Sequence, residues 1–199
     1  MANLYLNTYA PLVATASGRA ASETHGLLPF VDGSIRREPD LQHPMPSISC
    51  LCRGSKFAPR LRPDDRVIYM TKKARYGHPQ RHWRMTAVLR VSRMFESHAR
   101  AAAWYAENGL CVPSNCMVEG NPPNPLDHSH RQNTNKHLPD TKFLQRWDAG
   151  YRFRSKQNGT FVACEPLWVD LTWNAVAVHE EDLQHVFGKV PATRNPGAL

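Results

Sequence analysis

The alternation of apolar and polar residues along the chain predicts a β-sheet as the main structural element. Strands are typically segments that alternate with a period of two, or short apolar runs rich in aromatic and β-branched residues. Such segments occur at residues 3–9, 66–71, 83–95, 160–164 and 167–171. Residues 48–52 fit either a short buried strand or one helical turn, because periodicity does not distinguish the two over so short a run.

Two helices are predicted from their end signals. Residues 97–108 are rich in alanine, with Ser97 placed to cap the first turn and Gly109 suited to end the helix in the left-handed conformation. A shorter helix is predicted at residues 180–187, followed by Gly188. Helices and strands in this proportion indicate the α+β class. We expect a small curved mixed sheet or pseudo-barrel with helices at its margins.

Long irregular segments separate these elements. Glycines and prolines interrupt residues 10–47. Residues 121–142 are polar and contain four prolines, which predicts a long mobile loop, and residues 189–199 are expected to form a C-terminal tail. The whole chain has 199 residues, a length that suits one domain with its own core, so we expect a single domain over residues 1–199.

The positive charge is concentrated in the middle of the chain. The protein has 25 Lys and Arg against 17 Asp and Glu, which gives a formal net charge of +8. Residues 53–93 hold twelve of the basic side chains and only two of the acidic ones, so this segment accounts for the whole excess. A concentrated basic surface suits a polyanion such as nucleic acid, because binding releases counterions from the phosphates. A solvated surface that only maintains solubility has the same composition.

Aromatic residues lie among these basic residues, and rings that stack on bases beside cations that meet phosphates are typical of nucleic-acid sites. Tyr76 lies within the basic loop at 72–78 and Trp83 follows it. These two are the aromatic candidates for contact, although such rings are commonly buried in the core. The predicted nucleic-acid contacts are Arg36, Arg37, Arg53, Lys56, Arg60, Lys72, Lys73, Arg75, Tyr76 and Trp83. A pocket that accepts one base also needs fixed polar groups and further rings, for which the candidates are Asp32, Ser34, Ser49, Thr71, Asn115, Trp147 and Tyr151.

Neither a metal nor a cofactor is predicted. The five cysteines include the pairs Cys50/Cys52 and Cys111/Cys116, but their spacings differ from the usual zinc knuckles, and buried free thiols explain them more simply. The chain has no Walker loop, dinucleotide-binding glycine motif, nucleophile elbow or His-Glu-x-x-His sequence, so we assign no catalytic residue. It also lacks an apolar run of the ~20 residues that a membrane helix needs and an N-terminal signal peptide, so we expect no membrane partner and a cytoplasmic location.

Two segments carry a resemblance to a known superfamily. Residues 61–70 read Leu-Arg-Pro-Asp-Asp-Arg-Val-Ile-Tyr-Met and residues 83–91 read Trp-Arg-Met-Thr-Ala-Val-Leu-Arg-Val, with Cys-Leu-Cys-Arg upstream at 50–53 and Phe-Ala-Pro-Arg at 57–60. This arrangement resembles the core of the PUA-like superfamily, which includes ASCH and EVE domains and nucleotide-modification-associated domains. The resemblance covers residues 45–110. It departs from the usual Gly-Asp turn in placing Asp64 where glycine would tolerate a positive φ.

The resemblance implies a compact pseudo-barrel with a pocket between the sheet and its adjoining segments, which relatives use for RNA or for a modified DNA base. Together with the charge and the aromatic residues, it favours a module that binds a nucleotide or nucleic acid, DNA or RNA, and reads a modified or flipped base. The alternative is a hydrolytic or nuclease-like enzyme acting on nucleotides or nucleic acid. Its candidate catalytic residues are Asp32, Cys50, Asp64, Asp65 and His78. A third interpretation is an interaction protein whose basic surface meets an acidic partner.

Overall fold

The computed structural model describes residues 2–188 and 197–198. Its strands are β1 (Leu4–Tyr9), β2 (Ser47–Ser49), β3 (Arg66–Thr71), β4 (Trp83–Phe95), β5 (Phe161–Val169), β6 (Val176–Val178) and β7 (Gly197–Ala198). Its α-helices are α1 (Ala16–His25), α2 (His98–Glu107), α3 (Asp140–Gln157) and α4 (Glu180–Phe187). Short 3-10 turns occur at η1 (Leu12–Ala14), η2 (Gly54–Lys56), η3 (Ala58–Arg60) and η4 (Leu126–His128).

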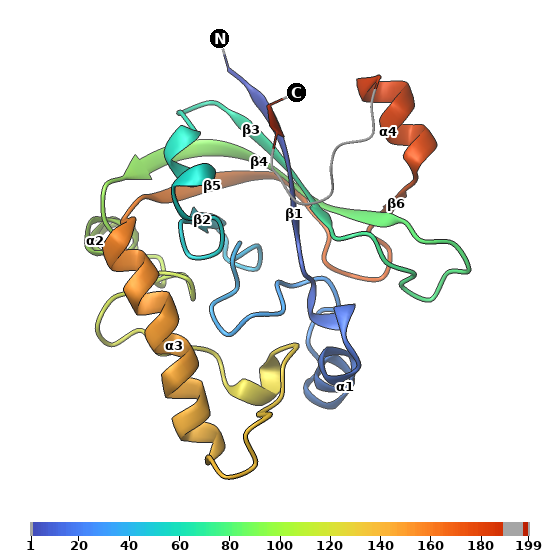
Figure 1. Cartoon of the computed structure of the whole chain (residues 1–199). Coiled ribbons are helices and arrows are strands. Elements are labelled where there is room, and N and C mark those ends of the chain that lie inside the picture. The colour runs from blue at the N-terminus through green and yellow to red at the C-terminus, as the bar shows by residue number, and fades with distance from the viewer. Residues whose placement is uncertain (1, 189–196, 199) are drawn as a thin grey trace.

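The strands form one curved mixed sheet, which has the shape of a half-barrel (Figure 1). Its order is β2-β5-β4-β3-β1-β7, and β6 pairs with the first residues of β4. Strands β1 and β3 run parallel, whereas the other pairs are antiparallel. The pairing of β4 with β5 shifts register at Val88/Leu89 and at Val91/Arg93, and such irregularities increase the local bend of a sheet. The predicted α+β class with a small curved mixed sheet is confirmed at this level.

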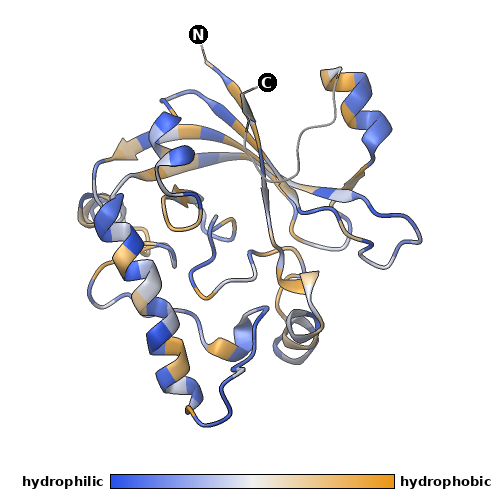
Figure 2. Cartoon of the chain, viewed as in Figure 1, coloured by the Kyte–Doolittle hydropathy of each residue, from blue (hydrophilic) through white to orange (hydrophobic). Residues whose placement is uncertain are grey.

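The main core lies between the sheet and the irregular segment that follows α1. Alternation in β4 directs Ala87, Leu89 and Val91 to one side, where each is 1% exposed or less. Phe30 from the irregular segment and Ile48 from β2 pack into the same cluster. In Figure 1 this segment passes beneath the curved sheet, and Figure 2 shows the apolar positions of the central strands that it covers. A chain rich in turns is therefore held in place by its scattered apolar side chains.

The predicted helices are confirmed together with their caps. The Ser97 hydroxyl accepts a hydrogen bond from the Arg100 backbone N–H at 3.2 Å, and Gly109 takes a φ of 68°. Helix α4 ends at Gly188, which is left-handed with a φ of 65°. The turn before β3 also forms as expected. Asp64 has a φ of 71°, and the buried carboxylate of Asp65 accepts hydrogen bonds from the backbone N–H groups of Asn3 and Arg62.

Several elements differ from the prediction. Helix α1 lies inside residues 10–47, where no element is predicted, and α3 begins at Asp140, within the segment expected to be a loop through residue 142. The two strands predicted at 160–164 and 167–171 are a single strand, β5. Residues 121–139 have little regular structure, but Asn124 and His130 donate backbone hydrogen bonds to Ile35 and Gly33. The described part of the predicted tail, Gly197–Ala198, pairs with β1, and the rest of it lies outside the described residues. Among the described residues, no helix has the length and apolar character needed to cross a membrane.

Candidate functional site

A cavity of about 870 Å³ opens between the sheet and α3, and we call it the central pocket. Its walls come from β1 (Asn7 to Tyr9), from the turn segment at 32–39, from residues 49–57 and from one side of α3. Its volume falls within the range of ~300–1,000 Å³ that is typical of small-molecule sites. Segments more than 100 positions apart in the sequence therefore meet around one space.

Most of the predicted pocket residues lie on these walls. They include the polar residues Asp32, Ser34 and Ser49 and the aromatic residues Trp147 and Tyr151. Of the predicted cationic contacts, Arg53, Lys72 and Lys73 line the pocket as well. The structure thus brings together, around one cavity, residues that the sequence analysis selected from four separate segments.

Helix α3 contributes a row of side chains to the pocket. Trp147, Tyr151 and Arg154 are spaced by four and three positions, which places them on one face of a helix. The guanidinium of Arg154 lies 4.4 Å from the centre of the Tyr151 ring, and that of Arg131 lies 5.3 Å from the Trp147 ring. Such cation–π contacts hold both rings beside positive charge. This wall therefore combines stacking surfaces with cations.

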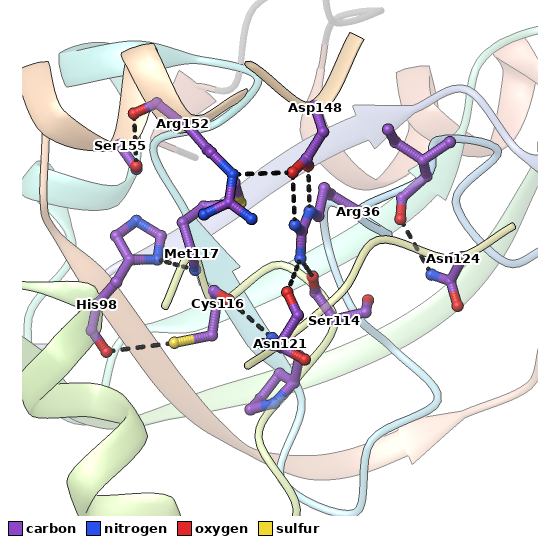
Figure 3. Close-up of polar contacts among 12 residues, drawn as sticks. Arg36, His98, Ser114, Cys116, Met117, Asn121, Asn124, Asp148, Arg152 and Ser155 are labelled. Atoms are coloured by element: carbon purple, nitrogen blue, oxygen red, sulfur yellow. Dashed lines mark hydrogen bonds and ion pairs between the residues drawn. The ribbon is translucent and has the colours of Figure 1, made fainter. Parts of the chain in front are cut away.

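The orientation of α3 depends on a buried ion pair that Figure 3 shows. Arg36 donates two hydrogen bonds to Asp148, with Nε to Oδ1 at 2.6 Å and Nη2 to Oδ2 at 2.9 Å. Its Nη1 also donates to the carbonyl oxygens of Ser114 and Asn121, at 3.2 and 3.0 Å. The Arg36 side chain is fully buried. Its prediction as a nucleic-acid contact is therefore wrong in this structure, because its charge is neutralised inside the protein.

Arg37 is also a structural residue. It is 5% exposed, and its guanidinium donates to the carbonyl oxygens of Asp32, Ser34 and His128. These bonds tie the turn at 32–37 to the segment before α3. Arg37 has a φ of 39°, a left-handed conformation that is unfavourable for a residue with a Cβ and persists only where surrounding contacts impose it. Its predicted contact with a phosphate is therefore wrong too, since the side chain is buried and its Nη1 and Nη2 atoms donate to backbone carbonyl oxygens.

Two carboxyl groups lie in the wall of the pocket, and both are 6% exposed. The Asp32 Oδ1 atom accepts from the backbone N–H of Ser34 at 2.9 Å and from the Ser34 hydroxyl. Burial raises the pKa of Asp32, against the lowering effect of the Ser34 hydrogen bonds and of the Arg37 charge. Burial raises the pKa of Tyr151, and the charge of Asp32 adds to the rise, so these two groups are close enough to interact electrostatically.

Glu38 is the second carboxyl group, and the sequence analysis missed it. Oε1 accepts from the Ser49 backbone N–H at 2.9 Å, while Oε2 accepts from the Ser49 hydroxyl and from Asn115 Nδ2, the latter at 2.9 Å. Burial raises the pKa of Glu38 to about 7 despite these bonds, and the charge of Asp32 adds to the rise. The sequence signal that could have identified Glu38 is its position directly after Arg36 and Arg37, which were predicted as nucleic-acid contacts.

The cations of the pocket lie at its exposed side. Lys72, Arg131 and Arg154 all line the pocket and are exposed to solvent. Lys73 is less available, because its ammonium pairs with Glu180 and lies 4.7 Å from the Trp83 ring. Arg53 donates to the Thr8 carbonyl oxygen at 2.7 Å. The pocket is therefore lined both by exposed positive side chains and by buried carboxyl groups.

Three other predicted residues, Trp83, Tyr76 and Thr71, are buried or partly buried and contact neighbouring residues of the protein. Trp83 is 1% exposed and packs with Met70 and Leu183, so its ring is not accessible for stacking, and its predicted contact is wrong in this structure. The Tyr76 ring packs edge-on against Phe30 at 5.4 Å, and its hydroxyl donates to the Lys72 carbonyl oxygen. Thr71 is fully buried and accepts from the Arg84 N–H.

The remaining predicted residues lie outside the pocket wall. Asn115 is fully buried behind it and contacts the pocket only through Glu38. Lys56, Arg60 and Arg75 are exposed side chains that do not line the pocket. The basic segment at 53–93 is consequently divided, because only some of its charges face the cavity. Of the residues named for the enzymatic alternative, Asp32 alone lines it.

The described residues contain one group suited to a metal ion, although no metal is predicted from the sequence. His25 Nε2 lies 3.3 Å from Asp127 Oδ2, and His128 Nε2 lies 3.8 Å from Asp127 Oδ1. Two imidazoles and a carboxylate are ligands that Zn²⁺ accepts. All three side chains are partly or largely exposed, on α1 and η4 outside the central pocket. The five cysteines are free, and none belongs to a ligand group among the described residues.

The chain matches no protein-family model, no curated protein and no solved structure.

Proposed function

We propose that this protein binds a nucleotide in the central pocket, either free or as one residue of a DNA or RNA strand, and that its half-barrel is of the PUA-like type. The observation that carries the proposal is the composition of the pocket: stacking rings, exposed cations and fixed polar groups border one cavity of about 870 Å³. A nucleotide needs these three features together, because it has a flat base, an anionic phosphate and a polar base edge.

The phosphate is assigned to the exposed side of the pocket. Lys72 and Arg154 meet solvent there, and phosphate contacts by such side chains supply the salt-dependent part of nucleic-acid affinity. The base is assigned to the space beside Trp147, where stacking on an aromatic ring contributes ~1–3 kcal/mol. Tyr151 is 4% exposed and supports this wall by packing with Ile35 and Leu51. A strand reaches this space only by presenting an unstacked base, so the proposal favours single-stranded or flipped nucleotides over an intact duplex.

The test compares two double variants of equal charge change. Lys72→Gln with Arg154→Gln removes two cations from the pocket, whereas Lys56→Gln with Arg60→Gln removes two exposed cations from elsewhere in the basic segment. Binding of fluorescently labelled single-stranded oligonucleotides of mixed sequence is followed by anisotropy from ~25 to ~200 mM KCl. The pocket variant is expected to lose affinity, and its slope of log K against log salt falls by about one unit, whereas the control keeps both. No binding at low salt, or equal losses in the two variants, contradicts the proposal.

A further inference from the structure

One part of the pocket wall, formed by the turn at 32–39 and by Ser49, offers mainly hydrogen-bond acceptors to a ligand. When ionised, as Glu38 is above about pH 7, the carboxylates of Asp32 and Glu38 accept hydrogen bonds and donate none. Two hydroxyl groups lie in the same wall, but that of Ser34 donates to Asp32 and that of Ser49 donates to Glu38. The Tyr9 hydroxyl likewise donates to the Phe30 carbonyl oxygen. These hydroxyl protons are therefore already directed to protein acceptors.

The two carboxylates retain acceptor capacity beyond these bonds. A carboxylate has about four lone-pair positions. The hydrogen bonds described for Asp32 both go to Oδ1, from the Ser34 backbone N–H and the Ser34 hydroxyl. The hydrogen bonds described for Glu38 use both lone-pair positions of Oε2 and one of the two lone-pair positions of Oε1. A ligand in the pocket thus meets two separate anionic acceptors, each held in place by backbone and side-chain donors.

Guanine is the nucleobase whose edge best matches two acceptors. Its Watson–Crick edge presents two adjacent donors, the ring N1–H and the exocyclic N2–H. Adenine and cytosine present one amino donor beside a ring acceptor, and uracil or thymine presents one N–H between two carbonyl oxygens. Each unmatched carbonyl or ring nitrogen would face a carboxylate, and an unpaired buried anion is unfavourable. The discrimination follows from this mismatch, because a site built for a donor rejects an analogue that lacks it.

We propose that Asp32 and Glu38 make the central pocket selective for guanine, with Asp32 accepting a hydrogen bond from its N2–H group and Glu38 accepting one from its N1–H group. The inference rests on the proposed function and specifies its ligand: a guanine nucleotide, free or unstacked from a strand. The cations at the exposed side of the pocket then bind the phosphate, while the two carboxylates determine which base enters. Both acids act as specificity-determining residues and take part in no covalent step.

The first experiment changes one atom group of the ligand. Nonanucleotides of thymidine carry guanine, hypoxanthine, xanthine or thymine at the central position, and their affinities are measured by anisotropy at low salt and about pH 8, where Glu38 is ionised. Hypoxanthine keeps N1–H but lacks the exocyclic amine. The guanine strand is expected to bind at least tenfold more tightly than the hypoxanthine strand and the all-thymidine strand, since each loses a hydrogen bond to a charged acceptor. Equal affinity for guanine and hypoxanthine overturns the inference.

The second experiment reverses the preference with Asp32→Asn. An asparagine retains an oxygen that accepts from Ser34, but its amide group presents donors to the ligand. Xanthine has a carbonyl where guanine has its amine, so the variant is expected to bind the xanthine strand more tightly than the guanine strand. A damaged fold does not produce this new preference. The control Asp64→Asn changes an exposed carboxylate outside the pocket and keeps the guanine preference.

The outcomes separate the two proposals. If none of the four strands binds, both the proposed function and the guanine selectivity fail. If all four bind equally and the pocket double variant weakens them, nucleotide binding stands and the guanine selectivity is overturned. An Asp32→Asn variant that weakens all strands in parallel, with no gain for xanthine over guanine, also overturns the selectivity, because it assigns Asp32 a role in shaping the turn alone.

Discussion

At the scale of single residues, the pairing of Arg36 with Asp148 has the greatest effect on how the pocket is built. The two residues are 112 positions apart, and their bidentate contact joins the turn beneath the sheet to α3. Asp148 is next to Trp147, so the ion pair that fixes one side of α3 also sets the side that faces the cavity. A charge that appears in the sequence as a candidate ligand contact thus positions other residues that line the pocket.

Removing one partner of this pair is expected to destabilise the protein strongly. Asp148→Ala leaves the Arg36 guanidinium buried without its anion, and such a loss typically costs ~3–5 kcal/mol in the free energy of unfolding. Urea denaturation followed by circular dichroism measures it. Arg152→Gln is the control, because Arg152 contacts the same carboxylate at 3.1 Å from an exposed position and should change stability by ~1 kcal/mol or less.

The double variant Arg36→Met with Asp148→Leu tests the cause of that loss. Apolar side chains of similar volume often replace a buried ion pair without loss of stability, because the desolvation of both charges is avoided. The double variant should therefore be more stable than Asp148→Ala alone. If the two variants are equally unstable, the buried charge is not the origin of the effect.

At the scale of elements, the sequence predicted those whose signals are local. Strands β3 and β4 alternate clearly, and α2 and α4 carry their capping residues within one turn. Helix α3 lacks such a signal because it is mostly hydrophilic, with only scattered apolar positions (Figure 2). It is held by the buried pair at Asp148 and by Leu144, Trp147 and Tyr151, which pack with Ile35 and Leu51. These contacts depend on residues far away in the sequence.

The candidate site was also predicted only in part, because contacts between residues far apart in the sequence determine which side chains line it. Side-chain chemistry identified Asp32, Trp147 and Tyr151, but it did not distinguish cations that face a cavity from those neutralised inside the protein. Charged residues are usually exposed, and Arg36 is an exception that only its distant partner explains. Trp83 is covered by Leu183 of α4, a contact between elements 100 residues apart.

Two helical glycines are expected to respond oppositely to the same substitution. A Cβ at Gly18 in α1 would lie 1.7 Å from the Leu12 carbonyl oxygen, so Gly18→Ala forces the helix away from η1 and should cost ~1–3 kcal/mol of stability or more. A Cβ at Gly150 in α3 meets no atom within 4 Å, so Gly150→Ala should add ~0.5–1 kcal/mol by favouring the helix. Urea midpoints of the two variants measure both effects. A stabilising Gly18→Ala would contradict the close packing of α1 on η1.

At the scale of the whole molecule, the pocket places ionisable groups where the fold must keep them from water. Asp32 and Glu38 are buried at a cavity wall, and burial is the largest cause of the raised pKa of each. An apolar pair of residues would fill this space at less electrostatic cost. The protein instead surrounds both carboxyl groups with hydroxyl and amide donors, which is consistent with a site maintained for a ligand.

The raised pKa of Glu38 predicts how the global stability depends on pH. In the unfolded chain this carboxyl group releases its proton near pH 4.5, whereas the folded protein retains it to about pH 7. The folded state therefore binds more protons between these values, and the free energy of unfolding falls as the pH rises through them. Asp32 acts in the same direction because its pKa is also raised. His98 opposes them below its ordinary value of 6.5, since burial lowers its pKa to about 4.

Glu38→Gln isolates the contribution of this one carboxyl group. Glutamine has no proton to release, so the stability of the variant relative to the parent protein should rise by on the order of 2–3 kcal/mol between pH 5 and pH 8, while the contributions of Asp32 and His98 largely cancel in the comparison. Urea denaturation at the two pH values gives the difference. A constant gap between variant and parent would mean that Glu38 is ionised across this range, and hence that the carboxylate wall is better solvated than its 6% exposure indicates.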